Sequence, residues 1–152
     1  MKKNNVVVAG RRQLAIAGDY GVAIAGAHGA AVAGAGGTAH TGYNGKAVAG
    51  ERGLATTGTD GVATVGAHGK ATAGRYGMAL ADAFGHAIVG AHGYARADLG
   101  GRVQGGEFAT LECEWYDRDA GRYRTTIGYV GEDGILPDVL YRCDDQGRLV
   151  GA

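Results

Sequence analysis

The chain has 152 residues, of which 31 are glycine and only one is proline, and its formal net charge is zero. This length predicts one domain, or one domain with an appendage, and the composition excludes collagen and proline-rich linkers. A neutral chain has no general attraction for nucleic acid or anionic membranes, and no apolar run approaches membrane-spanning length.

The first residues, MKKNNVVVAG, contain two lysines, but the apolar stretch after them is too short for a secretory signal. The two cysteines, Cys113 and Cys143, form no CxxC motif and make no disulfide framework. We therefore expect a cytoplasmic protein with no membrane partner.

From Asn5 the chain aligns without a gap in rows of eight residues, such as GVAIAGAH (21–28). With the eight columns labelled a to h, column a is almost always glycine, column c is alanine in most rows, and column f is glycine except at Asp82 and Asp98. A period held over twelve rows indicates stacked units. Because columns b to e alternate like a strand, we predict an all-β fold with a β-solenoid over residues 5–106. Two of these octads are expected to form one coil, and coils should stack at the strand spacing of ~4.8 Å.

The corners and the core follow from the same columns. Glycines at columns f and a flank a two-residue tip, and we expect them to supply the positive φ angles of the corners. Columns c and e never carry a charge, whereas columns b and d include Lys46, Lys70 and Arg96, so columns c and e are predicted to point inward. The core is then a ladder of methyl groups, each contributing on the order of 0.8 kcal/mol.

Column d is the outward column in which β-branched residues recur, and such an array favours a cover. We predict that it is buried against another copy of the chain, with a docking face for a different protein or a flat ice-binding surface as alternatives. The candidate surface consists of Val8, Ile16, Ile24, Val32, Val48, Thr56, Thr64, Thr72, Leu80 and Ile88.

The N-terminal end of the repeat provides a second candidate interface. The first row begins with Val6, Val7 and Val8, and no capping segment precedes it. An uncapped solenoid end leaves backbone groups unpaired, and these favour pairing with another strand. We therefore expect a homo-oligomer, either a dimer or a trimer, with these valines at an interface.

The period stops at Glu107, and residues 107–152 are predicted to form a small β-meander that caps the last coil. In FATLECEWYD (108–117) the residues alternate, which places Cys113 with the apolar residues as a buried thiol and Glu112 and Glu114 on a solvated face. Residues 107–152 carry five cations and ten acids, a net −5, whereas residues 1–106 carry ten cations and five acids, a net +5.

No motif predicts catalysis, a metal site or a cofactor. GAGGTA (34–39) contains a GxGxxA pattern, but it arises from the octads and no βαβ unit surrounds it. His28, His68 and His92 share column h, but with two octads per coil they lie on different edges or four coils apart, too far apart to bind one metal ion. The cations are scattered and no aromatic residues alternate with them, so the sequence does not favour nucleic-acid binding.

The octads, followed by LECEWYD (111–117), ILPDVLY (135–141) and the turn DDQG (144–147), resemble an uncharacterised family of phage and prophage proteins. That family combines Ala/Thr/Ser/Gly octapeptide repeats with a short tail that contains a Trp-bearing strand. The resemblance covers nearly the whole chain, although many members have a longer N-terminal region. It implies a viral origin and a location in the host cytoplasm, and the family has no assigned catalytic residues. VAIAG (22–26) is also similar to head repeats of trimeric autotransporter adhesins, which differ in spacing and carry export signals.

These observations favour a non-catalytic β-solenoid scaffold or binding protein that forms a homo-oligomer. The first alternative is an inhibitor that binds a host defence protein or nucleic-acid enzyme, so that its partner is a bacterial host protein. The second alternative is an adhesin-like or ice-binding surface protein.

Overall fold

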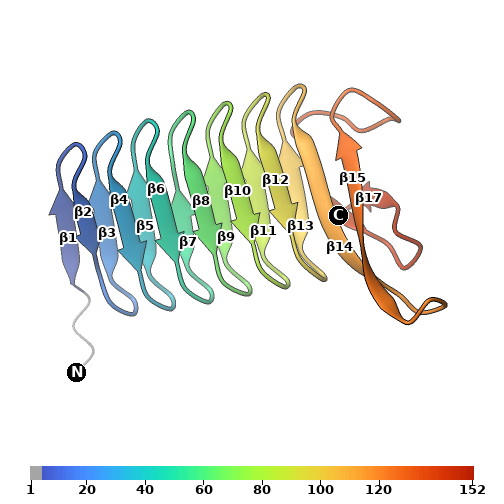
Figure 1. Ribbon diagram of the computed structural model, residues 1–152, viewed down its shortest axis with the longest axis horizontal. Helices are drawn as coiled ribbons and strands as arrows, with labels where there is room; N and C mark the ends of the chain where they lie inside the picture. The colour runs from blue at the N-terminus through green and yellow to red at the C-terminus, as the bar shows by residue number, and fades with distance from the viewer. Residues whose placement is uncertain (1–4) are drawn as a thin grey trace.

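The structure is a computed structural model that describes residues 5–152. The predicted fold class is confirmed, because these residues form strands and no helix, and the strands stack into a β-solenoid of about seven turns. Figure 1 shows the coils stacked along one axis, with the C-terminal segment folded over the last coil. The described residues contain no helix that is long and apolar enough to cross a membrane.

Thirteen short strands follow one another along the repeat. They are β1 (Val6–Ala9), β2 (Leu14–Ile16), β3 (Val22–Ala25), β4 (Ala30–Ala33), β5 (Thr38–Thr41), β6 (Lys46–Ala49), β7 (Leu54–Thr56), β8 (Val62–Val65), β9 (Lys70–Ala73), β10 (Met78–Ala81), β11 (His86–Val89), β12 (Tyr94–Ala97) and β13 (Arg102–Gly105). Four more strands form the C-terminal cap: β14 (Thr110–Asp117), β15 (Arg122–Tyr129), β16 (Tyr141–Cys143) and β17 (Leu149–Gly151).

Each repeat strand pairs in parallel with the strand that starts sixteen residues later, as in Val6 with Val22 and Val22 with Thr38. Two octads therefore make one coil, as predicted. Consecutive octads lie in opposite sheets. The first sheet has the order β1-β3-β5-β7-β9-β11-β13-β16-β17, and the second sheet has the order β15-β14-β12-β10-β8-β6-β4-β2.

The core lies between the two sheets and consists of columns c and e, as predicted. The column c alanines from Ala15 to Ala95 are fully buried, and the column e side chains from Ala17 to Ala97 are at most 5% exposed. Larger side chains enter column c only at the two ends, with the half-buried Val7 in the first coil and with Val103 and Leu111 at the C-terminal end. The narrow alanine ladder therefore widens where the cap begins.

The prediction that the corner glycines supply the positive φ angles is wrong. Positive φ occurs at column h instead, at side chains such as His28 (φ 59°) and Tyr76 (φ 57°). Most turns close with a hydrogen bond from the column a N–H to the column f carbonyl, as from Gly29 to Gly26 at 3.1 Å. The backbone N–H of column h then donates a hydrogen bond to the carbonyl oxygen of column g in the next coil, as from His28 to Tyr43 at 2.8 Å. The stacked turns thus continue the backbone ladder, which offsets the strain of left-handed side chains.

Glycine is needed at columns f and a because there is no space for a side chain. A Cβ added to Gly26 would lie 2.9 Å from the backbone nitrogen of Arg11 in the preceding turn. A Cβ added to Gly29 would lie 2.8 Å from the Cβ of Ala25. The close approach of successive coils, rather than backbone conformation, therefore accounts for the repeated glycines.

The cap extends each sheet with an antiparallel hairpin. The first half of β14, from Thr110 to Cys113, still pairs in parallel with β12, and the whole strand pairs antiparallel with β15. In the first sheet β16 pairs antiparallel with β13 through Val103 and Tyr141, and β17 pairs with β16. The parallel stacking thus runs through Cys113, so β14 belongs to both the solenoid and the cap.

Candidate interaction surfaces

Column d points outward, as predicted, but it does not form one continuous ladder. Because consecutive octads lie in opposite sheets, its members are divided between two outer faces. The first sheet carries Val8, Ile24, Thr56, Thr72 and Ile88, and the second sheet carries Ile16, Val32, Val48, Thr64 and Leu80.

The outer face of the second sheet is the more apolar of the two. Column b adds aliphatic side chains there, and Lys46 and Thr64 interrupt them. This aliphatic face consists of Leu14, Ile16, Ala30, Val32, Val48, Val62, Met78 and Leu80. It spans β2, β4, β6, β8 and β10, so it covers most of the length of the solenoid.

Within residues 5–152, the N-terminal coil leaves both sheets open. Among the described strands, β1 and β2 are the terminal members of their sheets, with a neighbour on one side only. Val6 and Val8 are 66% and 70% exposed, and Leu14 and Ile16 are 57% and 59% exposed. Val7 faces inward opposite the fully buried Ala23, yet it is only half-buried. We call β1, β2 and these exposed side chains the open end.

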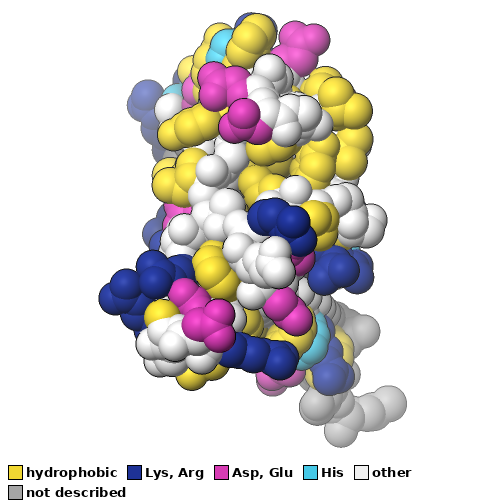
Figure 2. All heavy atoms as spheres, turned by 90° about the vertical axis from the view of Figure 1, so that its right-hand side faces the viewer, with side chains coloured by type: hydrophobic (Ala, Val, Ile, Leu, Met, Phe, Trp, Pro, Cys, Tyr) yellow, Lys and Arg dark blue, Asp and Glu magenta, His cyan; other side chains and the backbone are white. Residues whose placement is uncertain are grey.

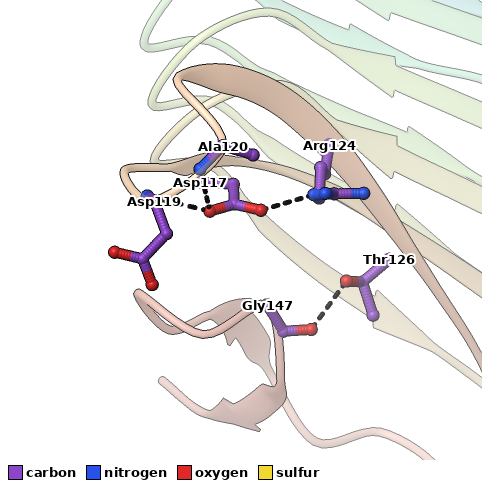
Figure 3. A network of polar contacts seen from close by, with 6 residues as sticks. All are labelled: Asp117, Asp119, Ala120, Arg124, Thr126 and Gly147. Atoms are coloured by element: carbon purple, nitrogen blue, oxygen red, sulfur yellow. Dashed lines mark hydrogen bonds and ion pairs between the residues drawn. The ribbon is translucent and has the colours of Figure 1, made fainter.

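The opposite end carries the cap, in which a polar network holds the turn between β14 and β15 (Figure 3). The carboxylate of Asp117 accepts hydrogen bonds from the backbone N–H groups of Asp119 at 3.1 Å and Ala120 at 3.0 Å. It also accepts one from Nε of Arg124 at 2.6 Å. The backbone hydrogen bond from Ala120, and then the contact with Arg124, hold the pKa of Asp117 below its usual value. The hairpin turn between β14 and β15 is therefore fixed by one ionised side chain.

The two cap hairpins are joined through Trp115 and Gly147. The indole ring lies so close to Gly147 that a side chain at this position would collide with it, and the glycine has a φ of +75°. Thr126 Oγ1 donates a hydrogen bond of 2.6 Å to the Gly147 carbonyl. Figure 2 shows charged side chains of both signs spread over this end of the molecule, which contrasts with the aliphatic open end.

The two cysteines are free thiols on strands of opposite sheets. Cys113 is buried, as predicted, and Cys143 is half-buried, with its Sγ 3.8 Å from the Cys113 carbonyl oxygen. A hydrogen bond between the two thiols, and then burial, raises the pKa of Cys113, whereas the same bond lowers the pKa of Cys143. Cys143 is therefore the more reactive thiol of the pair.

The histidines of column h contact aromatic rings: His28 meets Tyr43 edge to face at 5.4 Å, and His68 and His92 stack. His68 lies on the opposite edge from His92, as predicted, and stacks on Phe84 with ring centroids 5.3 Å apart. His92 lies between Tyr76 and Phe108, at 5.1 Å from each ring centroid. Within residues 5–152 no three potential ligand side chains come together. The spacing of sixteen residues in column h would have identified these stacks from the sequence.

The expectation that Glu112 lies on a solvated face is wrong. Its side chain accepts a hydrogen bond from the hydroxyl of Tyr94, and its Oε1 lies 3.6 Å from Nε of Arg96. Burial raises the pKa of Glu112 above the usual value. Because β12 and β14 are neighbours, the three side chains form a half-buried cluster on the outer face of the second sheet.

A row of two cations with a histidine between them, which the sequence did not reveal, lies on the outer face of the first sheet. Lys70, His86 and Arg102 occupy column b of β9, β11 and β13 and pair with one another in register. Arg102 Nη1 lies 3.4 Å from Nε2 of His86. Burial, followed by the charges of Arg102 and Lys70, lowers the pKa of His86. We call these three side chains the basic row. In the sequence Lys70 is one of several scattered cations, because His86 and Arg102 are sixteen and thirty-two residues away along the chain.

Asp82 and Asp98 begin the turns that follow β10 and β12. They line a shallow hollow on the outer side of the second sheet, together with Leu80 and Arg96. Asp98 Oδ1 lies 3.5 Å from Nε of Arg96, whereas Asp82 is exposed and no cation in residues 5–152 lies within ion-pair distance of it. We call these two carboxylates the acidic pair.

Comparisons with models of protein families, with curated proteins and with solved structures find no match to this chain. The resemblance to phage and prophage octad proteins therefore stays a prediction that rests on the repeat and the tail motifs.

Proposed function

We propose that this chain is a non-catalytic, phage- or prophage-encoded β-solenoid that serves as a rigid scaffold and associates with a second copy of itself through the open end. One observation carries the proposal: Val6, Val8, Leu14 and Ile16 are the most exposed aliphatic side chains of the solenoid, and all four lie on the two terminal strands. Such exposure of neighbouring aliphatic side chains is typical of a surface that another molecule covers.

The open end also lacks the features that keep sheet edges from pairing. Natural edge strands are protected by charged side chains, proline or bulges. The sequences of β1 (VVVA) and β2 (LAI) contain none of these residues. If β1 and β2 of one copy paired with the terminal strands of another, both sheets would continue across the contact. Burying the remaining surface of each aliphatic side chain would contribute about 1 kcal/mol, in addition to the backbone hydrogen bonds.

The proposal is tested by solution mass, measured by light scattering after gel filtration at two protein concentrations. We expect wild type to be larger than a monomer, and Val8→Lys to shift it toward the monomer by placing a charge at the contact. Thr56→Lys is the matched control, because Thr56 occupies the same column of the same sheet inside the solenoid. Wild type that is monomeric at both concentrations would overturn the proposal.

A second candidate function is direct binding to a host protein, such as a defence protein or a nucleic-acid enzyme. The aliphatic face of the second sheet favours it, because this face continues well beyond the open end. Val48 lies near the middle of that face, on β6. A host protein retained at fixed stoichiometry by wild type and by Val8→Lys, but lost with Val48→Lys, would support this candidate. Retention by the Val48→Lys variant would contradict it.

A further inference from the structure

The basic row and the acidic pair lie along the same edge of the solenoid. This edge is formed by the turns that lead from the second sheet to the first sheet, at residues 66–69, 82–85 and 98–101. Each member of the basic row directly follows one of these turns and lies on the first sheet. Asp82 and Asp98 start the second and third turns and lie on the side of the second sheet. Lys70 and Arg102 therefore place positive charge along one side of the edge, and the other side carries the carboxylates of Asp82 and Asp98, of which Asp98 is paired with Arg96.

The two sets of charges do not neutralise each other within one chain. Among residues 5–152, no carboxylate lies within ion-pair distance of Lys70 or Arg102. Burial, and then the charges of Arg102 and Lys70, lower the pKa of His86. Within residues 5–152 the basic row and the acidic pair thus form no ion pair with each other, and Asp98 contacts Arg96 on its own side of the edge.

The basic row and the acidic pair are confined to the same C-terminal coils of the solenoid, and the earlier coils carry neither. In the preceding coils the equivalents of the basic row are uncharged, namely Val6, Val22, Thr38 and Leu54. The equivalents of the acidic pair there are Gly18, Gly34, Gly50 and Gly66. A side chain is not favoured at most of these glycines, since a Cβ on Gly66 would lie 2.9 Å from the Glu51 backbone nitrogen. Asp82 and Asp98 therefore depart from the packing rule of the repeat in the coils that carry the basic row.

We propose that two copies of this chain associate side by side along this edge, so that the basic row of each copy lies against the acidic pair of the other. The contact is a parallel one, related by a two-fold axis that runs along the solenoid axis. Rotation about such an axis exchanges the two sides of the edge and leaves the level of every coil unchanged. Since both copies have the same coil spacing, positive and negative side chains meet at matching levels, twice in each dimer. The inference rests on the proposed self-association and adds a second surface to it.

The middle of the same edge carries an aromatic residue. Phe84 lies in the second of the three turns, its side chain is 55% exposed, and its ring stacks on His68 and covers Gly100. In the two-fold arrangement Phe84 of one copy meets Phe84 of the other at the axis. The contact then has an aromatic centre flanked by charged side chains, which is the arrangement common in protein interfaces.

The contact is tested by charge reversal in a Val8→Lys background, which removes the proposed association through the open end. The reversed basic row is Lys70→Glu with Arg102→Glu, and the reversed acidic pair is Asp82→Lys with Asp98→Lys. Asp82→Lys alone is a second variant, because Asp82 has no ion-pair partner to lose within residues 5–152. Lys46→Glu is the matched control, since Lys46 occupies the same column on the second sheet. Circular dichroism and thermal melting of each variant establish that it is folded.

Sedimentation equilibrium then measures the dimer dissociation constant. We expect each reversed variant to raise it about tenfold or more, because like charges now face each other, and Lys46→Glu to leave it unchanged. An equimolar mixture of the two doubly reversed variants regains a heterodimer, since every opposed pair again has opposite signs. Added salt weakens the parent dimer and the mixed dimer alike.

Two outcomes overturn the lateral contact while the proposed function stands. In the first, the parent is a dimer but the charge reversals behave as Lys46→Glu does. In the second, wild type self-associates but the Val8→Lys parent is monomeric. Monomeric wild type overturns both the contact and the proposed function.

Discussion

Ala71→Leu tests whether the alanine ladder is the feature that holds the solenoid together. Ala71 is fully buried in β9, and its in-register neighbours Ala55 and Ala87 on the adjacent coils are fully buried too. Between Ala15 and Ala95, column c contains nothing larger than alanine. Overpacking a dense core costs about 1 to 3 kcal/mol. We expect the upper value, about 3 kcal/mol, because the coil can widen only by breaking backbone hydrogen bonds in the sheets and turns.

The assay is thermal unfolding followed by circular dichroism. For a chain of this length, about 3 kcal/mol corresponds to a fall in Tm of about 6 to 12 °C. Ala30→Leu is the matched control, because Ala30 occupies outward column b of β4, beside the exposed Leu14. We expect the control to change stability by about 0.5 kcal/mol or less. Equal Tm values for Ala71→Leu and wild type would refute the inward assignment of column c and the close packing of the sheets.

Two further predictions concern the buried polar groups. The hydroxyl of Thr41 is buried and has no hydrogen-bond partner within residues 5–152. Thr41→Val replaces this hydroxyl with a methyl group, in a column that already contains Val65 and Val89. We expect the free energy of unfolding to increase by about 1 kcal/mol and the Tm to rise by about 3 °C. Differential scanning calorimetry measures the Tm, and a lower value for the variant would contradict this expectation. The second prediction concerns the thiols: iodoacetamide should modify Cys143 before Cys113. The lowered pKa of Cys143 gives it a larger thiolate fraction at a given pH, whereas Cys113 is buried and its pKa is raised. Peptide mapping of the alkylated protein over a pH series checks the order, and faster modification of Cys113 would show that the cap opens.

Much of this fold is predictable from the sequence because its pattern is local and repeated. A strand of four residues, a turn of four and a period of eight permit few closures, and small uncharged residues at columns c and e indicate which side is buried. The burial of Ala23 and Ala25, and the pairing of Val6 with Val22, follow from these columns. The sequence places the start of the cap at residue 107, where the glycine and alanine columns end, whereas the parallel pairing continues through Cys113.

The corners and the charged edge depend on how the coils pack against one another. The positive φ angle was expected at glycines such as Gly26, but it occurs at side chains such as His28. Glycine is required at position 26 for a different reason: a Cβ there would be too close to the backbone of the neighbouring turn in the preceding coil. That distance exists only between stacked coils. Lys70, His86 and Arg102 are sixteen residues apart along the chain and become neighbours only because two octads close each coil. The repeat thus specifies which residues face inward, and the stacking of coils determines which outward residues act together, because outward neighbours come from different turns of the chain.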